Sequence, residues 1–198
     1  MIDIIEKKMN IAEKSIKSLI LSEDLKKVSN SIEIANFYET KALNRLQSTR
    51  LIYSASSSNV GYSDYGEAVA ASYYSMYYIV HSFLALVYKT KLMEDVRGVH
   101  AITHNIILYY LVKTKMLAAH LYEEYVKTLE TTEKIHKLTI DSFQEEAFSY
   151  AKKYDKSREA REVFTYQTSA KIEATHSEKS IKIAEEFVNT IRLLMIRK

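Results

Sequence analysis

The sequence predicts an all-α fold, an up-and-down bundle of long helices with an N-terminal helical hairpin. Proline is absent from the 198 residues, and glycine occurs only at positions 61, 66 and 98. Apolar residues recur every three or four positions along most of the chain, which is the period of an amphipathic helix. A β-sandwich or barrel would need turn residues every 8–12 positions, and this sequence lacks them.

The first 60 residues are predicted to form the hairpin. Apolar residues spaced from Ile5 to Leu19 indicate a first helix that ends near Leu21. Ser22 offers an N-cap for a second helix, whose apolar positions are Leu25, Val28, Ile32, Ala35, Tyr38, Ala42, Leu46 and Ile52. These patterns favour an antiparallel pair, with one bent helix as the alternative. The serine-rich run from Ser54 to Gly61 predicts a loop between a hairpin at 1–60 and a bundle at 61–198.

The centre of the predicted bundle is the segment Ala68–Leu92, which is apolar on nearly every side. Such a helix is buried all round in a protein core or crosses a membrane. His81 and the many tyrosine and serine hydroxyls would need hydrogen-bond partners in lipid, so we expect a core helix and no membrane.

Further helices are expected along the second half. Apolar spacing predicts a helix over Val99–Leu117, then a helical pattern that continues from Leu121 toward Ile135 with its break at Thr131-Thr132. Another helix is expected from Phe143 through Phe164. The last helix has the cleanest apolar stripe, at Ile181, Ala184, Phe187, Val188, Ile191, Leu194 and Met195.

Composition narrows the function classes. The chain has no cysteine, which excludes disulfides and thiolate zinc sites, and its net charge of +3 permits a nucleic-acid partner without requiring one. The first 21 residues do not have the pattern of a signal peptide, so we expect a cytoplasmic protein. No glycine-rich phosphate loop, G-x-S-x-G motif or aspartate-rich metal pattern is present, and we expect no cofactor.

Four segments, in order, resemble the HEPN domain family. They are Ala71-Ser-Tyr-Tyr-Ser-Met-Tyr-Tyr78, Gly98-Val-His-Ala-Ile-Thr-His-Asn105, Arg161-Glu-Val-Phe-Thr-Tyr166 and the closing helix Ile181–Met195. The resemblance implies a helical bundle that binds or acts on RNA. It further implies a homodimer and a partner, commonly a small nucleotidyltransferase antitoxin, in a toxin–antitoxin or defence setting.

Catalytic candidates follow from the chemistry of metal-independent RNA cleavage. Histidine can move protons near neutral pH, and arginine can stabilise the charge of the phosphorane. The resemblance points to Arg161, but Tyr166 stands where an active family member has histidine, and tyrosine is a poor base at neutral pH. Arg97 and His104 are a second pair with suitable spacing. The prediction is therefore an RNA- or nucleotide-binding protein with a degenerate catalytic motif.

The predicted ligand-binding residues are Arg158, Arg161 and Tyr166, in a cleft that would bind phosphate. The alternative for the two arginines is a solvated helix face. His100 and His104 share a helix face, but no further ligand follows at metal-binding spacing, so no metal site is predicted. An active metal-independent ribonuclease and a structural helical scaffold without a ligand are the alternative functions.

The tyrosines of the central segment allow two interpretations. Tyr73, Tyr74, Tyr77 and Tyr78 could stack on nucleic-acid bases. On a buried helix, tyrosines more often belong to the core, with their hydroxyls bonded to neighbouring helices. We expect at least two of the four in the core and leave the others open.

Overall fold

The computed structural model describes residues 2–58, 64–152 and 174–197, with side chains for 7–58, 64–137 and 174–197. Within these ranges the fold is an all-α bundle with one two-stranded sheet, which confirms the all-α part of the predicted fold class. The helices and strands, in chain order, are α1 (Ile2–Leu21), β1 (Leu25–Lys27), α2 (Ser31–Ser58), α3 (Tyr65–Tyr88), β2 (Thr90–Leu92), α4 (Val99–Ile106), the π-helix η1 (Ile107–Val112), α5 (Ala119–Lys152) and α7 (Ala174–Ile196).

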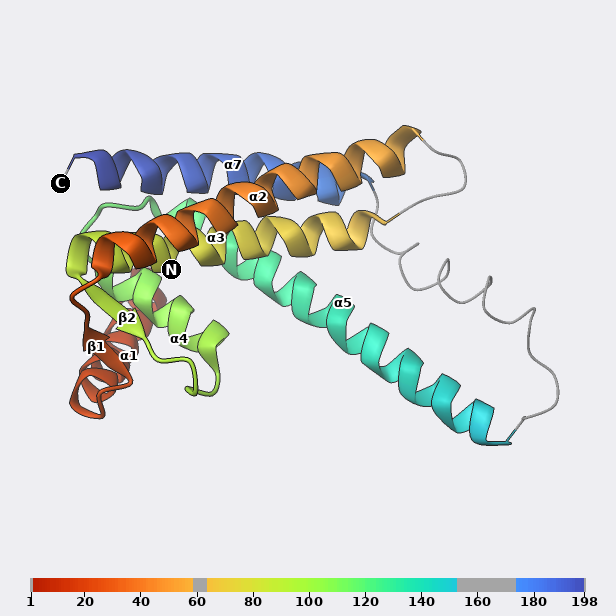
Figure 1. Cartoon of the computed structure of the whole chain (residues 1–198), viewed down its shortest axis with the longest axis horizontal. Coiled ribbons are helices and arrows are strands. Elements are labelled where there is room, and N and C mark those ends of the chain that lie inside the picture. The colour runs from red at the N-terminus through yellow and green to blue at the C-terminus, as the bar shows by residue number, and fades with distance from the viewer. Residues whose placement is uncertain (1, 59–63, 153–173, 198) are drawn as a thin grey trace.

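Helix α3 is the centre of the bundle, as its continuous apolar sequence predicts. Helices α2 and α7 lie alongside it, and α5 crosses it obliquely and then leaves the bundle (Figure 1). Small residues allow α2 and α3 to approach closely, and their hydroxyls bond across the interface. Ser82 Oγ donates to the Ala35 carbonyl at 2.8 Å, and Thr49 Oγ1 donates to the Ala68 carbonyl at 3.2 Å. These bonds satisfy polar groups that would otherwise be costly to bury.

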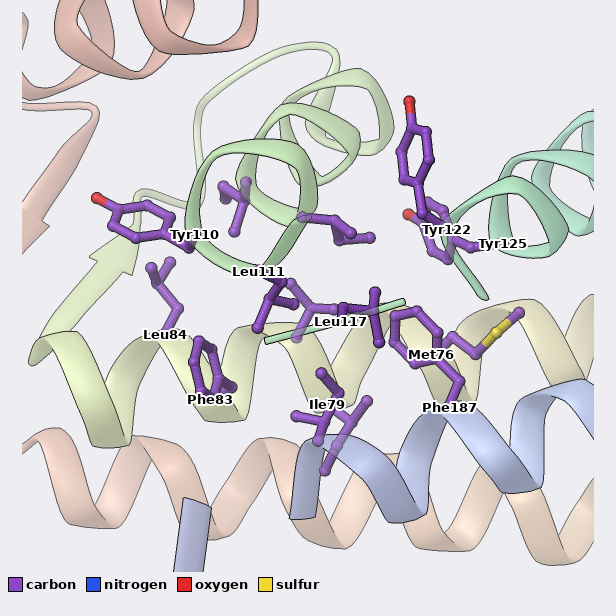
Figure 2. Packing of buried hydrophobic residues seen from close by; sticks show 14 of the residues in the cluster. Met76, Ile79, Phe83, Leu84, Tyr110, Leu111, Leu117, Tyr122, Tyr125 and Phe187 are labelled. Carbon is purple, nitrogen blue, oxygen red and sulfur yellow. The ribbon is translucent and has the colours of Figure 1, made fainter. Parts of the chain in front are cut away.

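The main core fills the space between α3, α4, α5 and α7. Figure 2 shows Met76, Ile79 and Phe83 of α3 facing Leu111, Leu117, Tyr125 and Phe187 from the surrounding segments. All of these side chains are buried. The seven positions predicted for the last helix are likewise buried, apart from Leu194, which is half-buried. The apolar stripe of α7 therefore packs on the core, as expected.

The first two helices do not form the expected antiparallel pair. Helix α1 packs against α4 and η1, whereas α2 packs against α3 and α7. The segment between them forms β1, which pairs antiparallel with β2 so that Leu25 lies opposite Leu92. Ser22 consequently precedes a strand and caps no second helix. Leu25 is buried in this sheet, not on a helix stripe.

Three predicted boundaries are wrong for local reasons. Helix α2 continues through the predicted serine loop as far as Ser58, whose hydroxyl donates to the Ser54 carbonyl one turn earlier. The central helix ends at Tyr88, because Lys89 adopts a left-handed conformation (φ 50°) and β2 follows. The helical segment from Val99 ends at Val112, at the end of η1.

Helix α5 passes without interruption through the predicted break at Thr131-Thr132. The Thr131 hydroxyl donates to the Lys127 carbonyl, and the Thr132 hydroxyl donates to the Thr128 carbonyl, each at 2.8 Å. Threonine that bonds back to the carbonyl four residues earlier is accommodated inside a helix. The two threonines therefore do not end it.

Candidate functional site

A cavity of about 270 Å³ opens where α3, α4 and α5 meet. Its lining combines aromatic, imidazole and charged side chains: Tyr73, Tyr74, His100, Leu129, Thr132, Glu133, His136 and Lys137. Two adjacent tyrosines come from α3, and His100 comes from the first turn of α4. The other five lie on α5 at positions three or four apart, which places them on one helix face. Since α5 runs unbroken past Thr132, this face stays continuous along the cavity.

A chain of hydrogen bonds leads from the core to this cavity. The Tyr125 hydroxyl donates to the Tyr73 hydroxyl at 3.5 Å, and the Tyr73 oxygen lies 2.6 Å from Nδ1 of His100. The Tyr73 hydroxyl can donate to Nδ1 or accept from it, depending on the tautomer of His100. In the tautomer in which Tyr73 donates, His100 carries its proton on Nε2. Nε2 has no protein partner within the described residues, so this tautomer gives the cavity a hydrogen-bond donor.

Burial keeps these groups in their neutral forms. It raises the pKa of Tyr73 well above that of a free phenol and lowers the pKa of His100 below its usual value. The charge of Glu133 opposes the shift of His100, and His136 adds to it. His100 is thus a neutral imidazole at neutral pH, which is the state that donation from the Tyr73 hydroxyl to Nδ1 requires.

A row of aromatic side chains extends from His136 of α5 across two tyrosines of α3 to Tyr38 of α2. We call Tyr38, Tyr78, Tyr74 and His136 the aromatic row. Successive ring centroids are 6.2, 6.3 and 6.3 Å apart, and the successive interplanar angles are 24°, 30° and 29°. The three tyrosines are half-buried and His136 is exposed. Part of each ring therefore remains accessible to a ligand.

Two cations of α2 accompany the aromatic row. Lys41 Nζ lies 5.4 Å from the ring centroid of Tyr78, and Arg45 Cζ lies 5.8 Å from that of Tyr74. Lys41 and Arg45 are one turn apart on α2, as Tyr78 and Tyr74 are on α3. Both cations are exposed and form no salt bridge with another described residue. Their charges thus remain available to an anion.

The structure divides the four tyrosines differently from the prediction. Tyr73 alone belongs to the buried core, at 1% exposure. Tyr74, Tyr77 and Tyr78 are half-buried. The expectation that at least two would lie in the core is wrong, because α2 and α5 cover this face of α3 only in part.

The predicted pair Arg97 and His104 lies within the described structure, and the two residues have different surroundings. Arg97 is exposed in the turn before α4 and forms no salt bridge with a described residue. His104 is half-buried and bonds through Nε2 to the Tyr122 hydroxyl, with the two rings stacked at 5.2 Å. Burial lowers the pKa of His104, and Lys8 adds to the effect. His104 points to a different neighbour from His100, although both lie on α4.

The other predicted site residues, Arg158, Arg161 and Tyr166, lie outside the described residues. Among the side chains that the structure does describe, no three histidine, aspartate or glutamate residues gather to hold a metal ion. None of the described helices is both long enough and apolar enough to span a bilayer.

Sequence reasoning missed the α5 side of the cavity. Glu133, His136 and Lys137 have the polar pattern of a solvated helix face, and the predicted break at Thr131-Thr132 concealed their continuity with Leu129. The spacing of Leu129, Thr132, Glu133 and His136 is the signal that could have placed them on one face. Comparisons of the chain with family models, with curated proteins and with solved structures found no match.

Proposed function

We propose that this chain is a HEPN-like protein that binds RNA or a nucleotide through the aromatic row and the adjoining cavity. The observation that supports this most directly is the position of two exposed cations, Lys41 and Arg45, beside half-buried rings of the aromatic row. Single-stranded nucleic acids are bound by this combination, in which bases stack on aromatic rings and basic side chains contact the phosphates. The four sequence segments that resemble HEPN domains support the same proposal independently.

The resemblance also defines the wider setting of the proposal. The protein would act as a homodimer and as the HEPN partner of a nucleotidyltransferase antitoxin, in a toxin–antitoxin or defence module. The departure at Tyr166 favours binding over cleavage, because tyrosine replaces the histidine that would move a proton. Arg158 and Arg161 would supply further phosphate contacts.

The test measures the affinity of the full chain for fluorescently labelled single-stranded RNA in EDTA, by anisotropy at several salt concentrations. Replacing Lys41 and Arg45 together by glutamine should weaken binding. If each contacts one phosphate, the slope of log affinity against log salt should fall by about 1.4, from roughly 0.7 per contact on a single strand. The matched control replaces Lys26 and Arg197, two exposed cations that likewise form no salt bridge with a described residue and lie over none of these rings.

Stacking is tested by Tyr74→Leu against Tyr109→Leu. Loss of one stacking platform costs about 1–3 kcal/mol of binding, so Tyr74→Leu should reduce affinity at least fivefold. Tyr109 is a half-buried tyrosine with Lys113 5.4 Å from its centroid, but it lies on η1 and should not matter. Absence of RNA binding, or equal effects of the two variants, would refute the proposal and favour a structural scaffold.

The same incubations, read on a gel, test the ribonuclease alternative. Cleavage in EDTA that disappears in Arg161→Ala, His104→Ala or Arg97→Ala would favour an active metal-independent ribonuclease. RNA that stays intact at high protein concentration would show that the protein does not cleave it, and the binding proposal would then stand without the ribonuclease alternative.

A further inference from the structure

The spacing of Tyr74 and His136 at the cavity suits a planar ligand. Their centroids are 6.3 Å apart and their planes are inclined by 29°. A flat ring stacked between two others needs about 6.8 Å, which is twice the base-stacking distance of roughly 3.4 Å. His136 is exposed on α5, so rotation of its side chain can separate the two rings. In the proposal below, one nucleobase stacks between them.

The size of the cavity agrees with a single base. Its volume of about 270 Å³ lies just below the range of roughly 300–1,000 Å³ typical of sites for drug-sized ligands. Tyr73, Leu129 and Thr132 form the buried part of the lining. A dinucleotide cofactor would exceed this space, whereas one base with its ribose and phosphate outside would not.

The two charged side chains at the cavity form no salt bridge with any residue that the structure describes. Glu133 and Lys137 are four residues apart on α5, a spacing at which opposite charges commonly pair, yet no salt bridge joins them or connects either to another described residue. Both instead line the cavity. The carboxylate offers two acceptor oxygens and the ammonium offers only donors. When Tyr73 donates to Nδ1, His100 adds an Nε2–H donor, and the cavity then presents one carboxylate with two acceptor oxygens and two donor groups.

We propose that the cavity binds the guanine base of the ligand, with Glu133 as the residue that selects it. Among the four RNA bases, only guanine has two adjacent donors, N1–H and the 2-amino group, and these match the two carboxylate oxygens. Its O6 and N7 are the acceptors that the Lys137 ammonium and His100 Nε2–H require. Adenine and cytosine each present a single exocyclic amino group, and the N3–H of uracil is flanked by two acceptors that a carboxylate repels.

This inference rests on the proposed binding of RNA or a nucleotide and specifies its base. The test compares the affinities of the full chain for GMP, IMP, AMP, CMP and UMP by calorimetry. GMP should bind about tenfold more tightly than the adenine, cytosine and uracil nucleotides, the low end for a hydrogen bond to an exposed charged group. IMP keeps N1–H and O6 but lacks the 2-amino group, so its affinity should be intermediate.

The variant Glu133→Gln should abolish the preference for GMP, because an amide offers one acceptor and a competing donor. The matched control is Glu130→Gln, an exposed acid on the same helix that does not line the cavity. Both positions are exposed, and circular dichroism verifies that both variants fold. A preference for GMP that Glu133→Gln removes and Glu130→Gln preserves supports the inference.

Other results would overturn the inference of guanine selection, and they differ in whether the proposed RNA binding survives. Equal affinity for all five nucleotides, or a GMP preference unchanged in Glu133→Gln, refutes guanine selection while the proposed RNA binding stands. If neither the nucleotides nor labelled RNA bind, the proposed function fails as well.

Discussion

Two histidine–tyrosine pairs on α4 have similar chemistry and different surroundings. The cavity pair is Tyr73 with His100, and the covered pair is His104 with Tyr122. In both, a half-buried imidazole bonds a buried phenol, and burial lowers the pKa of the histidine. Both members of the cavity pair line the cavity described above, and neither member of the covered pair does. On α4, a lowered histidine pKa therefore does not by itself indicate a binding site. The histidine must also line a cavity.

The difference follows from the four-residue spacing along α4. His100 lies in the first turn, where its ring meets those of Tyr73, Tyr74 and Tyr77 at centroid distances of 5.5, 6.1 and 5.5 Å. His104 lies one turn later and stacks on Tyr122 of α5. Helix α5 diverges from the bundle toward its C-terminal end (Figure 1). Its early residue Tyr122 thus covers His104, and its later residues leave room beside His100.

The largest expected effect is on the free energy of unfolding, and it comes from removing Tyr125, the buried residue that bonds to the cavity pair. Tyr125 is completely buried, bonds Tyr73 and stacks on Phe187 at 5.8 Å. Tyr125→Ala should lower the free energy of unfolding by about 3–5 kcal/mol, the usual cost of deleting a buried aromatic ring. Chemical denaturation measures this loss.

Tyr125→Phe separates packing from hydrogen bonding at the same position. It retains the ring and deletes only the hydroxyl, so about 1 kcal/mol is expected. A loss in Tyr125→Phe as large as in Tyr125→Ala would show that the hydroxyl chain, and not the ring, supports the cavity pair.

The second prediction concerns a third histidine, which faces no cavity. His81 of α3 is buried, and its Nε2 lies 2.9 Å from the Thr103 hydroxyl. Burial, with a smaller contribution from His100, lowers its pKa to about 4. The unfolded chain, with a histidine pKa near 6.5, then binds more protons than the folded chain between pH 6.5 and 4. Stability should consequently fall by about 3 kcal/mol as the pH decreases through this interval.

The pH dependence of unfolding in His81→Gln measures that contribution. The variant should lose most of this slope, whereas His176→Gln, at an exposed position on α7, should retain it. His100 and His104 have pKa shifts in the same direction, so a smaller slope should persist in His81→Gln. An unchanged slope in His81→Gln would place the acid sensitivity elsewhere.

The helices could be predicted wherever one periodicity dominated. The stripe from Ile181 to Met195 and the continuous apolarity of α3 each allow one interpretation, and the structure confirms both. Leu25 fits a helical stripe and a strand equally well. Leu25 belongs to a strand because it pairs with Leu92 in the sheet. Neither three-residue strand has a pattern of its own that a local reading could detect.

The candidate site was predictable on one side only. Tyr73 and Tyr74 were identified as possible base-stacking residues, and His100 was noted on its helix face, because aromatic and imidazole side chains stand out in an apolar segment. Glu133 and Lys137 have the composition of an ordinary solvated surface. They line a cavity only because α3 and α4 lie opposite them, and that neighbourhood is set by tertiary packing.

The smallest expected effect tests the two pairs directly through ligand binding. Tyr73→Phe and Tyr122→Phe each delete one hydroxyl and keep a buried ring. If the Tyr73 hydroxyl donates to Nδ1 and so holds the His100 proton on Nε2, Tyr73→Phe removes that donor. The affinity for GMP and for RNA should then fall about threefold, within the range for one hydrogen bond. Tyr122→Phe frees His104 in the same way, but away from the cavity, and should leave affinity unchanged. Equal losses in the two variants would mean that the distinction between the cavity pair and the covered pair has no bearing on binding.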